Sequence, residues 1–179
     1  MMTEISLNVL DVSENSTRAG ASLVTILVTA DTSADKLTIV IADNGCGMTP
    51  EQAAHVTDPF FTTRTTRKVG LGIPFFKYAA ESTGGSFHIE SEPGKGTTVT
   101  AVFGLSHIDR MPLGDMNATI HNLIVYHPDT DFLYTYTYND ASFTLDTREM
   151  RRFWEESRST PPKCPAYIME YLKENQQEN

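Results

Sequence analysis

Two polar side chains near the start of the chain, Asp11 and Asn15, have a spacing that suits chemistry. They lie in residues 5–19, where the apolar residues recur at helical spacing. Residues four apart on a helix project from the same face, so the two side chains point toward the same region. The spacing therefore allows a metal-and-acid pair. The alternative is that Asn15 is an ordinary surface asparagine near a helix end.

Three glycine-containing segments follow in a fixed order. They are Asp43-Asn44-Gly45-Cys46-Gly47, Gly70-Leu71-Gly72 and Gly94-Lys95-Gly96-Thr97. Each has an ordinary explanation when taken alone, because Asp, Asn and Gly are common turn formers and a Gly-x-Gly pair often marks a junction between a loop and a helix. Glycines at a helix start can also expose backbone N–H groups to phosphate oxygens. Arg64, Arg67 and Lys68 in the loop before Gly70 either supply countercharge or only solvate that loop.

The elements that must position these residues can be read from hydrophobic periodicity and turn residues. We expect a helix over 5–19, a hairpin of strands over 23–29 and 36–42, and a short helix that begins at the capping-box spacing Thr49 to Gln52. A polar, mobile loop over 57–69 is expected next, followed by a helix from Gly70 to about Thr83 and strands over 86–91 and 97–103.

The composition changes after residue 105, which predicts two domains, 1–105 and 106–179. A linker over 109–115 leads to a helix that Asp115 can cap. A strand, a turn at 139–140 and a second strand follow, and two helices end the chain. The first of these strands carries a row of aromatic side chains on one face, which should pack against the first domain or a partner: Phe132, Tyr134, Tyr136 and Tyr138.

Length, charge and cysteine content narrow the class of protein. The 179 residues are 40% hydrophobic and 21% charged, which is typical of a soluble globular chain. A net charge of -9 disfavours nucleic-acid and acidic-membrane partners, and no apolar run is long enough to span a bilayer. The two cysteines are far apart in the sequence, which favours a cytoplasmic protein with reduced thiols. The five histidines show no shared metal-ligand spacing, so we expect them to have core or surface roles.

The ordered combination of motifs resembles the Bergerat-fold or GHKL family of ATPases. That family contains gyrase B subunits, heat-shock chaperone ATPases, sensor histidine kinases and mismatch-repair ATPases. Glu14-Asn15-Ser16 with Ala19-Gly20-Ala21 looks most like the mismatch-repair version, whereas Asp58-Pro59-Phe60-Phe61 looks like the histidine kinases. The resemblance covers roughly residues 4 to 104. It implies an α+β fold, a two-layer α/β sandwich of the Bergerat type, here with a small C-terminal α+β appendage.

The resemblance also implies ligands, ATP and Mg²⁺, and a role for each motif. Asp43 would accept a hydrogen bond from the exocyclic amine of adenine, and Asn15 would coordinate the magnesium ion. Asp11 stands where hydrolysing members carry the acid that orients the attacking water. The other residues of the implied site are Gly45 and Gly47, which let the backbone approach the base, Thr97 near the adenine, the phosphate-binding Gly70, Leu71 and Gly72, and the cations Arg64, Arg67 and Lys68. Cys46 is interpreted as a small filler.

Two departures from the family pattern bear on function. The strand that usually precedes the first helix in histidine kinases is missing, so another part of the chain or a partner should fill that edge. Residues 105–179 also show no gyrase-like domain with a phosphate-contacting lysine, and no phosphoacceptor histidine precedes the motifs.

We therefore expect a Mg²⁺-dependent, ATP-binding cytoplasmic signalling regulator of the histidine-kinase or anti-sigma-factor type, which binds or phosphorylates a partner protein. The alternative is a stand-alone slow ATPase that uses hydrolysis to change conformation. A third possibility is an interaction module with a vestigial pocket.

Overall fold

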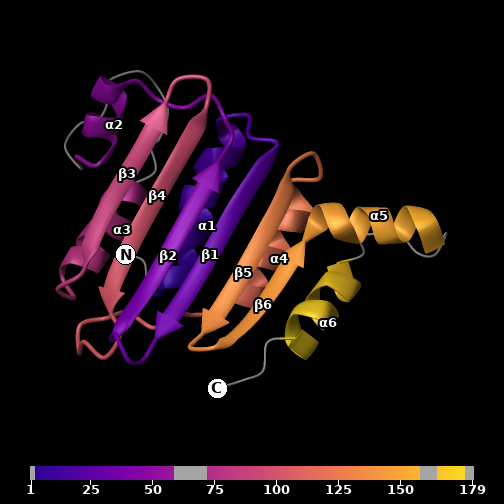
Figure 1. Cartoon of the computed structure of the whole chain (residues 1–179). Helices are drawn as coiled ribbons and strands as arrows, with labels where there is room; N and C mark the ends of the chain where they lie inside the picture. The colour runs from indigo at the N-terminus through magenta and orange to yellow at the C-terminus, as the bar shows by residue number, and fades with distance from the viewer. Residues whose placement is uncertain (1–2, 59–71, 158–164, 176–179) are drawn as a thin grey trace.

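Buried and half-buried residues alternate along the central strands because helices cover only one face of the sheet. The computed structural model describes residues 3–58, 72–157 and 165–175. Its strands are β1 (Leu23–Asp31), β2 (Lys36–Asp43), β3 (Ser86–Glu92), β4 (Gly96–Gly104), β5 (Asp131–Tyr138) and β6 (Ala141–Asp146). They form one sheet in the order β3-β4-β2-β1-β5-β6 (Figure 1). Neighbouring strands are antiparallel except β1 and β5, which are parallel.

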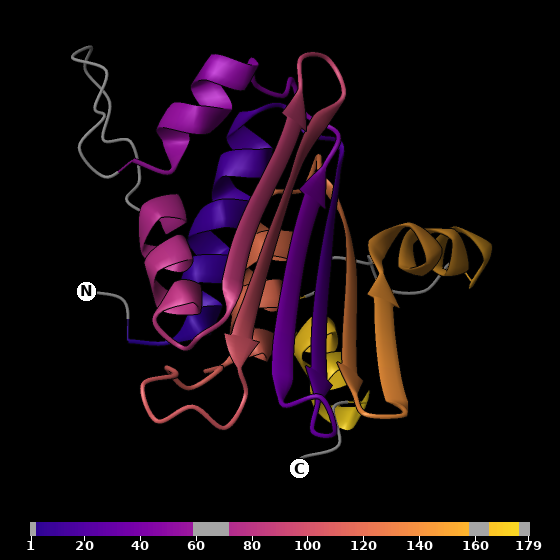
Figure 2. The same ribbon diagram turned by 60° about the vertical axis from the view of Figure 1, so that its left-hand side comes forward.

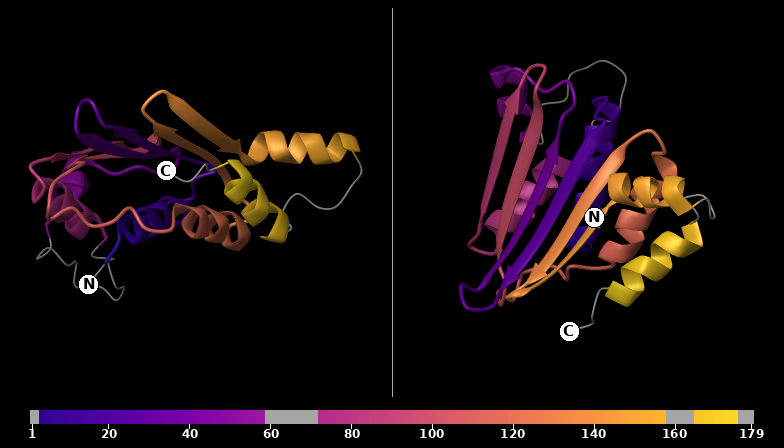
Figure 3. Two further views of the ribbon diagram at one scale, coloured as in Figure 1. Left: turned by 90° about the horizontal axis from the view of Figure 1, so that it is seen from below. Right: turned by 45° about the vertical axis from the view of Figure 1, so that its right-hand side comes forward.

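The helices are α1 (Ile5–Arg18), α2 (Pro50–Val56), α3 (Gly72–Glu81), α4 (Met116–Tyr126), α5 (Thr147–Ser157) and α6 (Pro165–Asn175). Figure 2 shows α1, α3 and α4 against the same face of the sheet. In the same view, α2 lies near the C-terminal end of α1. In the view from below, α5 extends outward from the end of β6 (Figure 3). The chain is thus a two-layer α+β sandwich, as the sequence predicts.

Helix starts follow the capping residues identified in the sequence. The Thr49 hydroxyl accepts from the backbone N–H of Gln52, and the Gln52 side chain accepts from the Thr49 backbone N–H, which completes the predicted capping box. The Asp115 carboxylate accepts from the backbone N–H of Ala118 at the start of α4. Both helices therefore begin where the sequence predicts.

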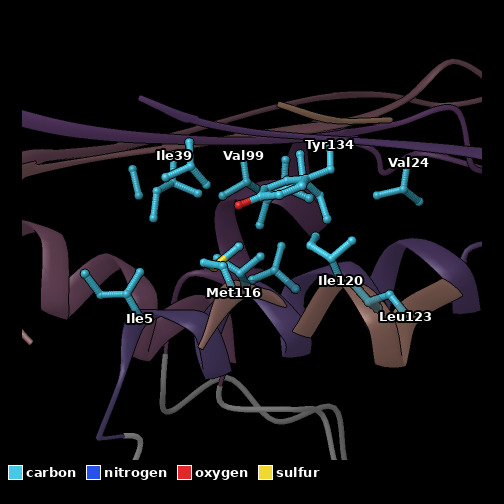
Figure 4. Close-up of a cluster of buried hydrophobic side chains, with 14 of the residues drawn as sticks. Ile5, Val24, Ile39, Val99, Met116, Ile120, Leu123 and Tyr134 are labelled. Atoms are coloured by element: carbon cyan, nitrogen blue, oxygen red, sulfur yellow. The ribbon is translucent and has the colours of Figure 1, made fainter. Parts of the chain in front are cut away.

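Side chains from both halves of the chain form the hydrophobic core. Figure 4 shows Val24, Ile39 and Val99 of the sheet facing residues of α1 and α4. Phe132 and Tyr134 of β5 are fully buried in this core, and Tyr136 and Tyr138 pack partly buried against it. The aromatic row therefore packs against the first half of the chain, as expected.

The chain's own residues 131–138 extend the sheet beyond β1. Eight consecutive residue pairs join β1 to β5, from Leu23 with Asp131 to Ala30 with Tyr138. The sequence leaves two possibilities for this sheet edge, another part of the chain or a partner. In the structure, β5 of the same chain occupies the edge. None of the helices in the described ranges has the length and apolar character needed to cross a membrane.

Candidate functional site

The first site residues lie on α1, on the side that faces the beginning of α3. Asp11 is half-buried, and a Cβ built on Gly72, the first residue of α3, would collide with its Oδ2 atom. This oxygen is buried and has no hydrogen-bond partner among the described residues. Asn15 lies one turn further along, and among the described residues its Oδ1 accepts only a long bond, 3.4 Å, from Nη1 of the exposed Arg18. The structure thus brings the predicted acid and amide to one side of α1.

Glu14, the other acid beside Asn15, faces a different element. Its Oε1 lies 2.8 Å from Nε2 of His127, the residue that caps the C-terminal end of α4. Adjacent helical residues are rotated by about 100°, which places Glu14 away from α3. Asp11 is therefore the acid that accompanies Asn15 at this site.

Asp43 ends β2 on the sheet face that the helices cover, and two fixed donors hold its carboxylate. Ser16 Oγ donates to Oδ2 at 2.6 Å, and the backbone N–H of Gly45 donates to Oδ1 at 2.9 Å. The two donors come from different elements, the last turn of α1 and the loop after β2. The carboxylate plane is consequently fixed before any ligand arrives.

The glycines beside Asp43 are needed for backbone packing within the protein. Gly47 has φ +66°, and a Cβ there would collide with the carbonyl oxygen of Glu92. Gly96 has φ +114°, and a Cβ there would collide with the carbonyl oxygen of Asp43. A Cβ on Gly45 would come within 2.9 Å of Ala19 Cβ. These glycines let the loop after β2 pack closely on α1 and on the turn before β4.

Thr97 lies beside Asp43, because the two residues are register partners on β4 and β2. Its Oγ1 is 2.8 Å from Oγ of Ser91, the partner of Thr97 on β3. Ser91 Oγ also accepts from the backbone N–H of Met48 at 2.8 Å. A chain of polar groups therefore runs from the loop after β2 to Thr97.

Part of the predicted phosphate-binding segment can be placed. Gly72 is buried at the start of α3, against Asp11. Gly70, Leu71, Arg64, Arg67, Lys68 and most of the predicted mobile loop lie outside the described residues. The described part of the segment therefore contributes the N-terminus of α3, which lies beside Asp11 of α1.

The interpretation of Cys46 as a filler is wrong. The side chain is exposed, because the backbone around it packs through the flanking glycines. Within the described ranges, no three His, Cys, Asp or Glu side chains group in a way that could hold a metal ion.

Two residues of this site, Ser16 and Ser91, have no role that the sequence predicts. Ser16 directly follows Asn15, and its place on the buried side of α1 was the only signal that it turns toward the sheet. The role of Ser91 depends on its register with Thr97, which the sequence does not reveal. Both residues orient polar groups that the sequence did identify.

The arrangement combines the groups that a nucleotide site needs. A fixed carboxylate lies at one end of the covered sheet face, and an amide oxygen and an unpartnered carboxylate oxygen lie on the adjacent helix. Carboxylate and amide oxygens accept amine hydrogen bonds and bind hard cations such as Mg²⁺. The helix N-terminus at Gly72 favours an anion.

Part of this chain is similar in sequence to a known family and to known proteins. Residues 1–107 match the family described as histidine kinase-, DNA gyrase B- and HSP90-like ATPase. The sensor protein SrrB of Staphylococcus aureus is 33% identical over 102 residues, which are 54% of this chain and 17% of SrrB. A putative sensor protein of Shewanella frigidimarina is 39% identical over 70 residues, 38% of this chain and 11% of that protein. The chain thus spans less than a fifth of either relative.

A solved structure shows the same fold. The N-terminal domain of a DNA repair protein superposes with a TM-score of 0.57 and 15% identity, over 81% of this chain and 53% of that one. The family match covers residues 1–107, which is more than half of the chain. The chain therefore belongs to the family of histidine kinase-, DNA gyrase B- and HSP90-like ATPases.

Proposed function

We propose that the chain binds Mg²⁺-ATP between α1, α3 and the strand ends, and that it acts as a signalling regulator of the histidine-kinase or anti-sigma-factor type. The observation that carries the proposal is the fixed Asp43 carboxylate, each oxygen of which accepts one hydrogen bond from the described residues. An ionised carboxylate has about four lone-pair positions, so acceptor capacity remains for a ligand.

Asp43 would recognise adenine through its exocyclic amine. Adenine offers a donor at this position, whereas guanine offers a carbonyl oxygen that a carboxylate repels. A hydrogen bond to a charged acceptor contributes roughly 1.5–3 kcal/mol. Thr97, next to Asp43 in the sheet, would contact the same base. Gly45 and Gly47 would let the backbone of the loop after β2 approach the base.

Asn15 would hold the magnesium ion. Within the described ranges its Oδ1 accepts only the long bond from Arg18, which a cation can replace. Magnesium keeps several waters and phosphate oxygens as ligands, so one or two protein oxygens suffice. When bound, the ion would neutralise phosphate charge. Gly70, Leu71 and Gly72 would bind the phosphates, with Arg64, Arg67 and Lys68 as countercharge.

The regulator role is supported by the relatives, two of which are named as sensor proteins. It predicts a protein partner that this chain binds or phosphorylates when nucleotide is present. We expect the immobilised chain to recover one protein from the source cell with Mg²⁺-ATP and not with Mg²⁺ alone, and γ-labelled ATP to label that protein if transfer occurs. An Asp43→Asn chain is the control. Equal recovery by this variant, or without ATP, would contradict a nucleotide-dependent role.

A second candidate function, slow hydrolysis of ATP, is favoured by Asp11. Its buried Oδ2 has no partner in the described part of the chain and lies against the first residue of α3. A carboxylate oxygen with free acceptor capacity beside bound phosphates can orient and deprotonate a water molecule. This activity would make the chain a stand-alone ATPase.

A further inference from the structure

Among the described residues, the Ser16 hydroxyl makes one well-formed hydrogen bond, and its acceptor is Asp43. Ser16 is 4% exposed, in the last turn of α1. Its Oγ lies 2.6 Å from Asp43 Oδ2 and 3.5 Å from the carbonyl oxygen of Val12. A hydroxyl carries a single proton, and the shorter contact to a charged acceptor is the stronger one. The Ser16 hydroxyl therefore donates its proton to Asp43 Oδ2.

This bond joins the two ends of the proposed nucleotide site. Ser16 directly follows Asn15 on α1, whereas Asp43 lies at the end of β2. The backbone N–H of Cys46 donates to the carbonyl oxygen of Ala19 at 3.0 Å, so the end of α1 is also tied to the loop after β2. With the Gly45 bond on Oδ1, the Ser16 bond leaves the carboxylate one orientation.

We propose that Ser16 is the positioning residue for adenine recognition, which holds the Asp43 carboxylate in the orientation that accepts the exocyclic amine. The proposal rests on the proposed function, since it acts through Asp43 on the base. Loss of the hydroxyl removes the donor on Oδ2, so the Asp43 carboxylate can rotate away from this orientation. It should therefore weaken binding only of nucleotides whose base has the amine.

The test compares two nucleotides in a Ser16→Ala variant. One is ADP, and the other is purine riboside 5′-diphosphate, which has hydrogen in place of the 6-amino group. Calorimetry with Mg²⁺ should show ADP binding weakened about tenfold in Ser16→Ala, as expected for the loss of one such bond, with less than a twofold change for the analogue. The ratio of the two affinities cancels any change in the folded fraction, because both ligands bind the folded chain.

Ser13→Ala is the matched control. Ser13 is fully buried on the same helix, and its Oγ has no hydrogen-bond partner among the described residues. The same atom is removed from the same helix, and both affinities should stay as in the parent. If Ser16→Ala does not fold, Ser16→Cys keeps the side-chain volume with only a weak donor, and the same selective loss is expected.

The outcomes separate this inference from the proposed function. Unchanged ADP binding in the Ser16 variants, or an equal loss for both nucleotides, overturns the positioning role while ATP binding stands. A parent chain that binds ADP and the analogue equally well overturns the assignment of Asp43 to the amine, and the Ser16 role with it. A selective loss for ADP supports both.

Discussion

The two acids near Asn15 differ in their partners, and this difference separates their roles. Glu14 is paired with His127 of α4, whereas Asp11 leaves a buried oxygen unpartnered within the described residues, beside Gly72. A general base must lie within hydrogen-bond reach of the water it activates, and of the two acids it is Asp11 that lies at the start of α3, where the phosphates would bind. We therefore assign any hydrolysis to Asp11.

Intrinsic hydrolysis should be slow and should depend on Asp11. Aspartate is one methylene shorter than the glutamate usual in hydrolysing relatives, and a misplacement of about 1 Å can lower a rate on the order of 10²-fold. We expect Asp11→Asn to lower the phosphate-release rate further and Glu14→Gln to leave it nearly unchanged, with ATP affinity kept in both. A steady-state phosphate assay with calorimetry on the same samples measures this. Loss of activity only in Glu14→Gln would show that the wrong carboxylate was chosen.

Among the residues of the site, the sequence predicts those with distinctive chemistry and misses those that support them. Helical spacing indicates that Asp11 and Asn15 share one face, and the resemblance carried by the ordered motifs singles out Asp43. Ser16 and Ser91 have no distinctive type or spacing, and their roles arise from contacts across elements. The exposed Cys46 was misjudged because the close packing is made by glycine backbones on either side of it.

At the level of the elements, the loop after β2 and the turn before β4 pack backbone against backbone. Gly96 lies against the carbonyl oxygen of Asp43, and Gly94 N–H donates to the carbonyl oxygen of Cys46 at 2.7 Å. Each glycine of this turn has positive φ, but only Gly96 lacks room for a Cβ. An alanine at Gly94 would therefore introduce backbone strain alone, whereas an alanine at Gly96 would introduce both backbone strain and steric overlap.

Gly96→Ala should damage both stability and nucleotide binding, whereas Gly94→Ala should affect stability alone. A left-handed alanine costs about 1–2 kcal/mol, which is the whole effect expected at the open Gly94 position. At Gly96 the added Cβ must also displace Asp43, so we expect a larger loss, at least about 3 kcal/mol. Urea unfolding and ADP titration of both variants measure these effects. Similar stabilities for the two variants would contradict the close approach.

β5 contains a second feature that can be tested, the buried Tyr134 hydroxyl. It has no hydrogen-bond partner among the described residues, and burial, with a smaller contribution from Tyr136, raises the pKa of Tyr134. Replacement by phenylalanine removes an unsatisfied polar group, so Tyr134→Phe should raise the free energy of unfolding by about 1 kcal/mol.

The same substitution should alter stability at alkaline pH. The unfolded tyrosine ionises near pH 10, whereas the folded one stays protonated above that pH, so the parent should lose stability as pH rises past 10. Tyr134→Phe should lose less. Unfolding curves between pH 8 and 11 check both effects, and a destabilised phenylalanine variant would show that the hydroxyl has a partner.

For the whole molecule, the second half of the chain completes the sheet and core of the first. β5 pairs with β1 along its length, and α4 and α6 bury apolar side chains in the shared core: Met116, Ile120, Leu123, Ile124, Ile168 and Leu172. The sequence predicts nearly every helix and strand from local patterns. It cannot predict the parallel pairing of β1 with β5, because that pairing depends on contacts more than a hundred residues apart. We propose that residues 106–179 form a subdomain that folds only together with residues 1–105.

Removal of residues 106–179 should abolish cooperative folding. The truncated chain would expose one edge of β1 and the core face now covered by Phe132 and Tyr134. Each large apolar side chain contributes roughly 1.5–3 kcal/mol when buried, and total stabilities are about 5–15 kcal/mol. We expect no sharp thermal transition by circular dichroism. A shortened chain as stable as the parent would assign residues 106–179 to an independent appendage.

The proposed function of the whole molecule depends on a nucleotide site that recognises adenine through Asp43. Calorimetric titration of the parent chain and of Asp43→Asn with Mg²⁺-ATP and Mg²⁺-GTP tests this most directly. The parent should bind ATP at least about tenfold more tightly than GTP, and Asp43→Asn should lose most of this preference, since one charge-assisted hydrogen bond is worth at least 1.4 kcal/mol, about a factor of ten. Equal affinity of the parent for ATP and GTP, or a variant that keeps the preference, would contradict the account.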